Sequence, residues 1–222
     1  MPDFHAPLFP NQIYHIINHA NGFENLFVNR GNYHYFLQQY AKYIFPIART
    51  YAYCLMPNHF HLLVKMRSEE ELTIRFLELK EQGSKSLQGF ETLGGMEDGK
   101  VSKTLSQQFS NLFNGYTQAF NKQQNRKGSL FIPNFRRSGV SEETYFFTCL
   151  RYIHQNPVRH GFAKELMEWE HSSIHSFVGS RKSKVEREEV MDWFGKNYKA
   201  SEKEFWLFHN QGWDSDDLDL EI

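Results

Sequence analysis

Cysteine is scarce in this chain of 222 residues, which contains only Cys54 and Cys149. The two are far apart, no CxxC pair occurs, and both lie among apolar residues, so they favour buried thiols over a disulfide or a zinc knuckle. Long hydrophobic runs are also missing, because no stretch reaches the roughly eighteen apolar residues of a membrane-spanning helix, and the first residues lack the pattern of a secretory signal. These absences predict a cytoplasmic protein that does not span a membrane.

Net charge is nearly absent as well, since 25 Lys and Arg face 26 Asp and Glu. The overall charge therefore provides no attraction for nucleic acid or for an anionic membrane. The charges are nevertheless segregated along the chain. The stretch 122–159 has seven basic residues and two acidic ones, whereas the final WDSDDLDLEI has five acids and no base. This pattern indicates one surface that faces a polyanion and one solvated acidic tail.

The apolar pattern predicts a mixed fold. Residues 12–19 alternate apolar and polar side chains before an Asn-Gly turn, and 47–57 and 58–66 are two strand-like runs that meet at Pro57-Asn58. Helical periodicity follows the first strand and recurs in 105–124 and 141–157, where Pro157 is expected to end the helix. This order predicts an α+β sandwich in which helices pack on an antiparallel sheet.

Two segments stand apart from this pattern. Residues 68–103 are charged and rich in glycine, and we expect an insertion with a short helix over 72–79 and a mobile loop around 94–99. The chain beyond 179 has a possible helix over 186–194 and then the acidic tail. We therefore predict one domain over 1–179, including the insertion, and a C-terminal extension over 180–222.

Two histidines, His59 and His61, interrupt an otherwise apolar strand. Residues i and i+2 of a strand point to the same face, so the two imidazoles lie side by side while Phe60 points the other way. Such a pair can share one metal ion. On spacing alone, two unrelated histidines that each hydrogen-bond to a neighbour are the favoured explanation, because a motif of two histidines is short and common.

A second motif is RYIHQNPVRHG, in which Tyr152 and Asn156 are four residues apart on a helix and share a face. By itself this is compatible with an ordinary helix end. Together with the histidine pair it gives two nitrogens and an amide oxygen for a divalent cation, and a phenol as nucleophile, which suits metal-assisted phosphoryl transfer. Tyr116 is the competing nucleophile, although its apolar stripe favours a core position.

Basic residues are interleaved with aromatic ones just before the tyrosine helix. This composition suits phosphate contacts and base stacking on a single strand, and a solvated basic turn is the alternative. Two further arginines flank the tyrosine. The predicted DNA-binding residues are Arg126, Lys127, Phe131, Arg136, Arg137, Arg151 and Arg159.

The segment PNHFHLLV resembles the histidine-hydrophobe-histidine strand of the HUH single-strand nucleases, and YIHQNPVRHG resembles the tyrosine helix of the REP-associated tyrosine transposases. FNGYTQAFNKQQNRKGSLFIPNFRRS is similar to that family's helix and basic connector, so the resemblance runs from about residue 14 to 179. It implies a ferredoxin-like HUH endonuclease core that acts on single-stranded DNA, often a hairpin from a repetitive palindrome.

The resemblance also implies the roles of individual residues. His59, His61 and Asn156 match the ligands of a Mg²⁺ or Mn²⁺ ion, and Tyr152 matches the nucleophile that forms a 5′-phosphotyrosine and frees a 3′-OH. Two alternatives remain open: a hairpin-binding protein that does not transpose DNA, and a metallohydrolase that uses water. A monomer and a homodimer are both compatible with the sequence.

Overall fold

One antiparallel sheet forms the centre of the computed structural model, which describes residues 4–82, 98–178, 182–195 and 198–212. The strands lie in the order β2-β3-β1-β4. Their bounds are β1 (Ile13–His19), β2 (Ala48–Leu55), β3 (His59–Met66) and β4 (Arg136–Gly139). Helices connect β1 to β2 and β3 to β4, which gives the βαββαβ order of a ferredoxin-like fold. The predicted α+β sandwich and its β2–β3 hairpin are confirmed.

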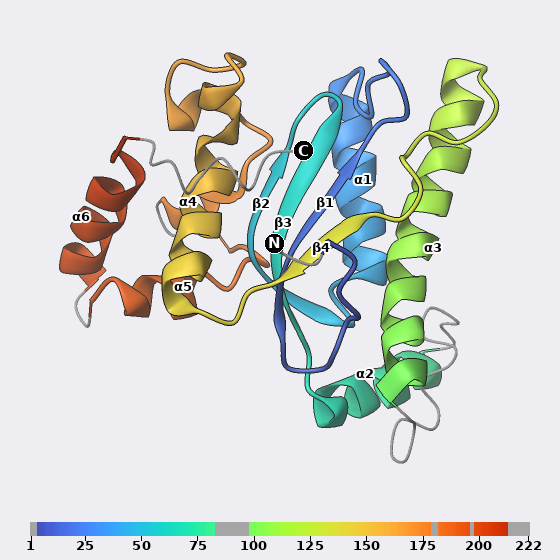
Figure 1. The fold of residues 1–222 in the computed structure, drawn as a ribbon, viewed down its shortest axis with the longest axis horizontal. Coiled ribbons are helices and arrows are strands. Elements are labelled where there is room, and N and C mark those ends of the chain that lie inside the picture. Colours follow the sequence, from blue (N-terminus) through green and yellow to red (C-terminus); the bar gives the residue numbers. More distant parts are fainter. Residues whose placement is uncertain (1–3, 83–97, 179–181, 196–197, 213–222) are drawn as a thin grey trace.

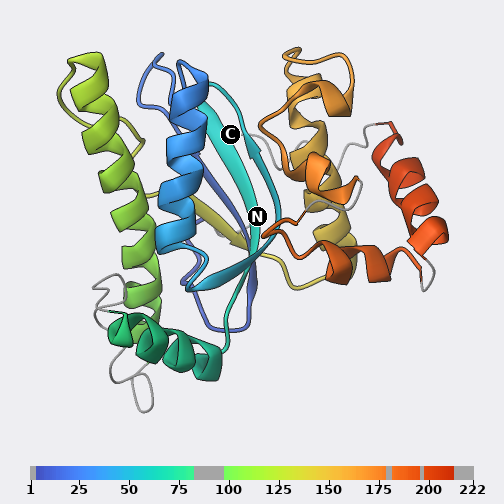
Figure 2. The same cartoon turned by 180° about the vertical axis from the view of Figure 1, so that it is seen from behind.

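Helices cover both faces of this sheet. On one face lie α1 (Arg30–Tyr43) and α3 (Asp98–Gln124), and on the other lies α4 (Glu143–Arg159) with α5 (Arg187–Trp193) and α6 (Tyr198–His209) outside it (Figure 1). Seen from behind, α1 crosses the sheet with α3 beside it (Figure 2). Two short 3₁₀ helices follow α4, at Leu166–Glu168 and Ser173–Phe177.

The alternation of β3 separates two apolar cores. Phe60 packs between α1 and α3, with its ring centroid 5.2 Å from that of Phe36 and 5.8 Å from that of Phe113. Leu63, on the other face, joins the core beneath α4. His59 and His61 share this second face because they differ from Leu63 by an even number of residues. The sheet thus presents both imidazoles to the helix that carries Tyr152.

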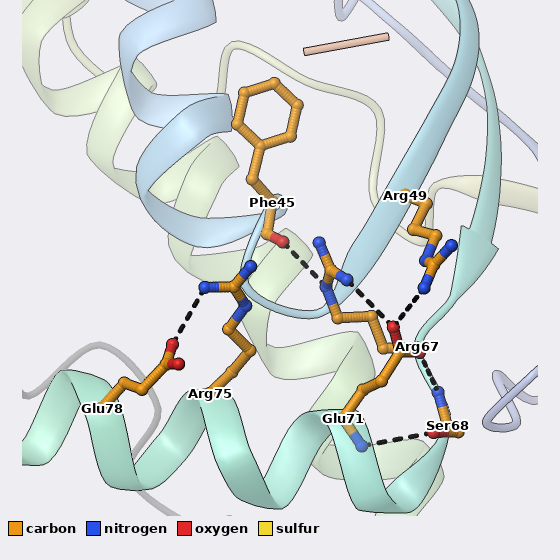
Figure 3. Close-up of polar contacts among 7 residues, drawn as sticks. All are labelled: Phe45, Arg49, Arg67, Ser68, Glu71, Arg75 and Glu78. Carbon is orange, nitrogen blue, oxygen red and sulfur yellow. Dashed lines mark hydrogen bonds and ion pairs between the residues drawn. The ribbon is translucent and has the colours of Figure 1, made fainter. Parts of the chain in front are cut away.

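The predicted insertion begins with a helix, α2 (Glu69–Glu81), that is longer than the expected 72–79. Ser68 and Glu71 form a reciprocal capping box at its start. The Glu71 carboxylate also pairs with Arg49 of β2 at 2.5 Å and with Arg67 at 3.3 Å (Figure 3). These contacts fasten the start of α2 to the sheet.

Two helix boundaries differ from those predicted. Helix α3 begins at Asp98, so the last part of the predicted insertion over 68–103 is helical. Helix α4 continues past Pro157 to Arg159, so the expected stop at the proline is wrong. A proline in the last turn removes only one donor, and the His160 amide still reaches the Asn156 carbonyl at 3.0 Å. Residues 83–97, which hold most of the predicted mobile loop, lie outside the described residues.

Part of the predicted C-terminal extension packs against α4. The ring of Phe205 on α6 lies 4.8 Å from that of Phe177 and 6.3 Å from that of His154 on α4. Cys54 and Cys149 are buried thiols that form no disulfide, as predicted. Within the described ranges no helix combines the length and apolar character needed to cross a bilayer. The acidic residues 213–222 lie outside the described residues.

Candidate active site

The register of β1 and β3 builds the floor of the candidate active site. His19 lies opposite His59, and Ile17 lies opposite His61, so histidines from both strands gather on the face that α4 covers. The rings of His59 and His61 are perpendicular, with centroids 5.0 Å apart. The structure therefore brings together the two imidazoles that strand alternation predicted to be neighbours.

Asn156 of α4 reaches down to both imidazoles. Its Oδ1 lies 3.2 Å from Nε2 of His59, and its Nδ2 lies 3.3 Å from Nε2 of His61. The Asn156 side chain is completely buried. The three groups that the sequence predicts as metal ligands thus converge on one point between the sheet and the helix.

Tyr152 lies one helical turn before Asn156 on the same face of α4. Its ring meets that of His61 edge-on, with centroids 5.2 Å apart, and the guanidinium of Arg159 lies 5.4 Å from its centroid. Tyr152 borders a cleft of about 580 Å³ that His59 and His61 also line. A group that enters this cleft would meet the phenol and both imidazoles together.

Burial keeps these imidazoles neutral. Loss of water lowers the pKa of His59 to about 4, and the hydrogen bond that the protonated ring would donate to Asn156 only partly offsets this effect. Burial likewise lowers the pKa of His61 well below its usual value and that of His15 to about 3. At neutral pH each ring therefore keeps a lone pair on one nitrogen, which is the form that binds a metal ion.

The donor set fits a divalent cation. Two imidazole nitrogens and an amide oxygen leave further coordination positions for phosphate oxygens, and no competing proton has to be displaced at neutral pH. Among the described residues no cluster of three His, Cys, Asp or Glu side chains has the geometry of a metal site. A cation held here would therefore depend on the Asn156 amide.

Three residues of this region were not recognised in the sequence. His15 Nε2 lies 3.1 Å from Nδ1 of His61, and Asn58 Oδ1 lies 2.9 Å from Nδ1 of His59. The ring of His19 stacks on that of His59 with an interplanar angle of 3°. The alternation of β1 places His15 and His19 on one face, which is the signal that was available. The sequence could not show which residues of β3 they face, because this depends on the register of the two strands.

Adjacent arginines of β4 take opposite faces of the sheet. Arg136 lies opposite Ile17, which lies opposite His61, so Arg136 belongs to the same cross-strand row as that imidazole. Arg137 lies opposite Ile16 and faces the other way, where its Nε donates to the Ala6 carbonyl at 2.5 Å. Of this predicted pair, only Arg136 shares a face with the cleft.

The remaining basic residues of the predicted DNA surface differ in their surroundings. Arg126 is tied to the chain by an ion pair with Glu24 and a hydrogen bond to the Ser129 carbonyl. Lys127 is exposed. Arg151 is only 5% exposed, and its guanidinium lies over the ring of Phe208. Burial of Arg151 beneath α6 corrects the prediction that it contacts DNA.

Two aromatic predictions are also resolved by burial. Phe131 packs in the core with its ring centroid 4.9 Å from that of Phe113, and it is 5% exposed, which argues against its predicted stacking on DNA bases. Tyr116, the competing nucleophile, is buried in the same core and donates its hydroxyl to the Leu26 carbonyl at 2.5 Å. Tyr116 is therefore separated from the imidazoles by the sheet.

Comparisons with known proteins agree with this geometry. No family model matches the chain. The curated Haemophilus influenzae protein "Putative REP-associated tyrosine transposase" is 26% identical over 130 residues, which are 58% of this chain and 60% of that protein. A solved structure of a REP-associated tyrosine transposase bound to a REP hairpin matches with a TM-score of 0.53 and 14% identity, covering 84% of this chain and 98% of the other.

The chain resembles the REP-associated tyrosine transposases in sequence and in fold. The match spans about 60% of the length of the curated tyrosine transposase. The solved tyrosine transposase shares the fold at low sequence identity. The fold expected from the histidine strand and the tyrosine helix is thereby confirmed.

Proposed function

We propose that this protein is a transposase-like enzyme that cleaves and rejoins single-stranded hairpin DNA through a 5′-phosphotyrosine intermediate. The observation that supports it best is the convergence of Tyr152, His59, His61 and Asn156 at one buried point beside a cleft. Hairpin DNA as substrate is inferred from the solved relative, which is bound to a REP hairpin. The cytoplasmic location predicted from the sequence belongs to the same proposal.

Tyr152 is the nucleophile of the proposed reaction. Its phenol gives up a proton, the phenolic oxygen attacks a backbone phosphorus, and a tyrosine–phosphate bond forms as the bond from phosphorus to the 3′ oxygen breaks. The departing oxygen takes up a proton and becomes a free 3′-OH. Because the phosphate stays in ester linkage to the protein, a 3′-OH can attack it later and rejoin the strand.

Other residues of the cleft support this step. His59, His61 and Asn156 would hold Mg²⁺ or Mn²⁺, which when bound would polarise the scissile phosphate and stabilise charge on the 3′ oxygen. The Arg159 guanidinium, 5.4 Å from the centre of the Tyr152 ring, favours negative charge that develops on the phenol. Arg136 shares the sheet face of the cleft, which supports its proposed contact with the backbone of a bound strand.

The test is a hairpin oligonucleotide labelled at its 3′ end and incubated with the full chain and Mn²⁺. A 5′-phosphotyrosine retains the 3′ fragment, so the labelled strand should migrate with the protein after boiling in detergent. Tyr152→Phe should abolish this adduct. Tyr116→Phe is the matched control and should retain it, because the Tyr116 hydroxyl bonds to the Leu26 carbonyl in the opposite core.

Each other outcome contradicts the proposal in a distinct way. An adduct that survives in Tyr152→Phe would show a different nucleophile. Metal-dependent cleavage without a protein-linked fragment would indicate a hydrolase that uses water. Salt-sensitive binding of several hairpins, with no cleavage of any, would indicate a hairpin-binding protein.

A further inference from the structure

We propose that His19 and Asn58 are positioning residues that fix one tautomer of His59, with the proton on Nδ1 and a bare Nε2 directed at Asn156. The inference rests on the proposed function only in taking His59 as a metal ligand. The tautomer itself follows from hydrogen bonds in the metal-free protein. The hydrogen bonds of His19 and Asn58 reach His59 at Nδ1, on the other side of the ring from its Nε2, so both residues act through His59.

The backbone holds these residues together. The β2–β3 turn is fastened to the end of β1, because the Ala20 amide donates to the Asn58 carbonyl at 2.7 Å. His19 ends β1 directly opposite His59, which begins β3. The Asn58 amide therefore bridges two parallel rings, with Nδ2 3.0 Å from Nε2 of His19 and Oδ1 2.9 Å from Nδ1 of His59.

The chain of hydrogen bonds begins at an atom that can only accept. The Ala20 carbonyl lies 2.8 Å from Nδ1 of His19, so this nitrogen carries the proton of the neutral ring. Nε2 of His19 is then bare and accepts from Nδ2 of Asn58. This contact orients the amide and directs Oδ1 at His59, which must donate from its own Nδ1. A neutral imidazole has one such proton, and Nε2 of His59 is left with a lone pair.

That lone pair lies in the right place for a cation. Nε2 of His59 faces Oδ1 of Asn156 at 3.2 Å, and neither atom has a proton to give the other. A divalent cation can accept electron pairs from both. The opposite tautomer would place an N–H where the cation has to bind. The hydrogen-bond relay from the Ala20 carbonyl through His19 and Asn58 to His59 thus excludes the His59 tautomer with a protonated Nε2 before a cation binds. Hydrogen bonds behind metal ligands commonly have this effect.

His61 is held in the same tautomer by a different contact. Nδ2 of Asn156 can only donate and lies 3.3 Å from Nε2 of His61, so this nitrogen accepts and the proton of the neutral ring is on Nδ1. Nδ1 of His61 then donates to Nε2 of His15 at 3.1 Å. Both predicted ligands therefore direct a bare Nε2 at Asn156, and only His59 depends on His19 and Asn58 for this.

The first test reads the tautomer without metal. Long-range ¹H–¹⁵N correlation spectra of the ¹⁵N-labelled full chain at pH 8 distinguish a protonated Nδ1 from a protonated Nε2, and comparison with His59→Gln assigns the His59 signals. We expect protonated Nδ1 in the wild type. Asn58→Leu and His19→Phe should move His59 toward protonated Nε2, since Oδ1 of Asn156 can then accept.

The second test measures Mn²⁺ binding to the same proteins by electron paramagnetic resonance of the free ion. Loss of a hydrogen bond behind a metal ligand should weaken binding by about 10- to 100-fold in Asn58→Leu and His19→Phe. His19→Gln offers an amide oxygen near the position of the ring Nε2 and should restore both the tautomer and the affinity. His34→Phe, at an exposed position of α1, is the control and should change neither.

Protonated Nε2 on His59 in the wild-type spectrum would overturn the inference. So would Asn58→Leu and His19→Phe proteins that keep both the tautomer and the Mn²⁺ affinity of the wild type. These results are independent of the DNA reaction. If the variants change the His59 tautomer as expected but no Tyr152 adduct forms, the proposed function is wrong and the relay stands. If the adduct forms but the wild-type His59 carries its proton on Nε2, the relay is wrong and the proposed function stands.

Discussion

Arg136 and Arg137 follow one another in the sequence, but strand geometry gives them different partners. Arg136 lies on the face of the cleft, in the cross-strand row of Ile17 and His61, and its guanidinium lies 4.9 Å from the Phe4 ring. Arg137 lies on the opposite face and donates to the Ala6 carbonyl. We therefore predict that Arg136→Ala weakens hairpin binding, whereas Arg137→Ala chiefly lowers the free energy of unfolding.

The measurement for this pair is hairpin affinity over a range of salt concentrations. Loss of one phosphate contact should reduce the slope of log K against log salt by about 1 for Arg136→Ala and should weaken binding to all hairpin sequences alike. Arg137→Ala should keep the wild-type slope. Equal losses of slope in both variants would show that the face assigned by the register does not decide contact with DNA.

At the scale of secondary-structure elements, a buried chain of polar groups joins α6 to the helix that carries Tyr152. His209 donates from Nδ1 to the Phe205 carbonyl at 2.9 Å, so its Nε2 accepts from Nδ1 of His154 at 2.8 Å. Nε2 of His154 in turn accepts from the hydroxyl of Ser173 at 2.8 Å. Each donor in this series of hydrogen bonds has an acceptor, as buried polar groups require.

Removal of one member should therefore be costly. His209→Ala leaves the Nδ1 proton of His154 buried without an acceptor, and we expect the free energy of unfolding to fall by about 1–3 kcal/mol from this loss alone. Urea unfolding measures the change. Lys203→Ala, at an exposed position of the same helix, should stay within about 0.5 kcal/mol of the wild type. Comparable losses in both variants would mean that α6 is fixed by other contacts.

The periodicity of strands and helices was enough to predict which of the candidate site residues share a face. Alternation in β3 placed His59 and His61 on the same face of the sheet, and helical spacing placed Tyr152 and Asn156 on the same face of α4. Both periods could be read from the sequence because they depend only on backbone geometry. The pairing of β1 with β3 depends on contacts between distant segments, so His15 and His19 could not be placed from sequence. The burial of Arg151 could not be predicted for the same reason, since it depends on Phe208 of α6, a helix distant in the sequence.

Across the whole molecule, folding buries neutral histidines on both sides of α4. Burial lowers the pKa of His15 and of His209 to about 3, and that of His59 to about 4. It lowers the pKa values of His61 and His154 well below the usual range, with nearby histidines adding to the effect. These groups come from β1, β3, α4 and α6, so the effect belongs to the fold as a unit.

The sign of the resulting pH dependence follows from proton binding. In the unfolded chain these histidines titrate near pH 6.5, while in the folded protein they stay neutral to a much lower pH, so the unfolded state binds more protons below pH 6.5. The free energy of unfolding should be highest above pH 6.5. It should fall as the pH drops from 6.5 to 5, by up to about 1.4 kcal/mol per pH unit for each buried histidine.

Urea unfolding at pH 8, 7, 6 and 5 tests this prediction, in a range where most carboxylates remain ionised. His209→Gln should flatten the fall because it removes one of the buried groups, whatever its effect on stability at pH 8. His34→Gln, at an exposed position of α1, should keep the wild-type slope. Stability that stays constant from pH 8 to pH 5 would mean that these imidazoles gain protons without unfolding, and the neutral rings required at the candidate metal site would then no longer be assured by burial.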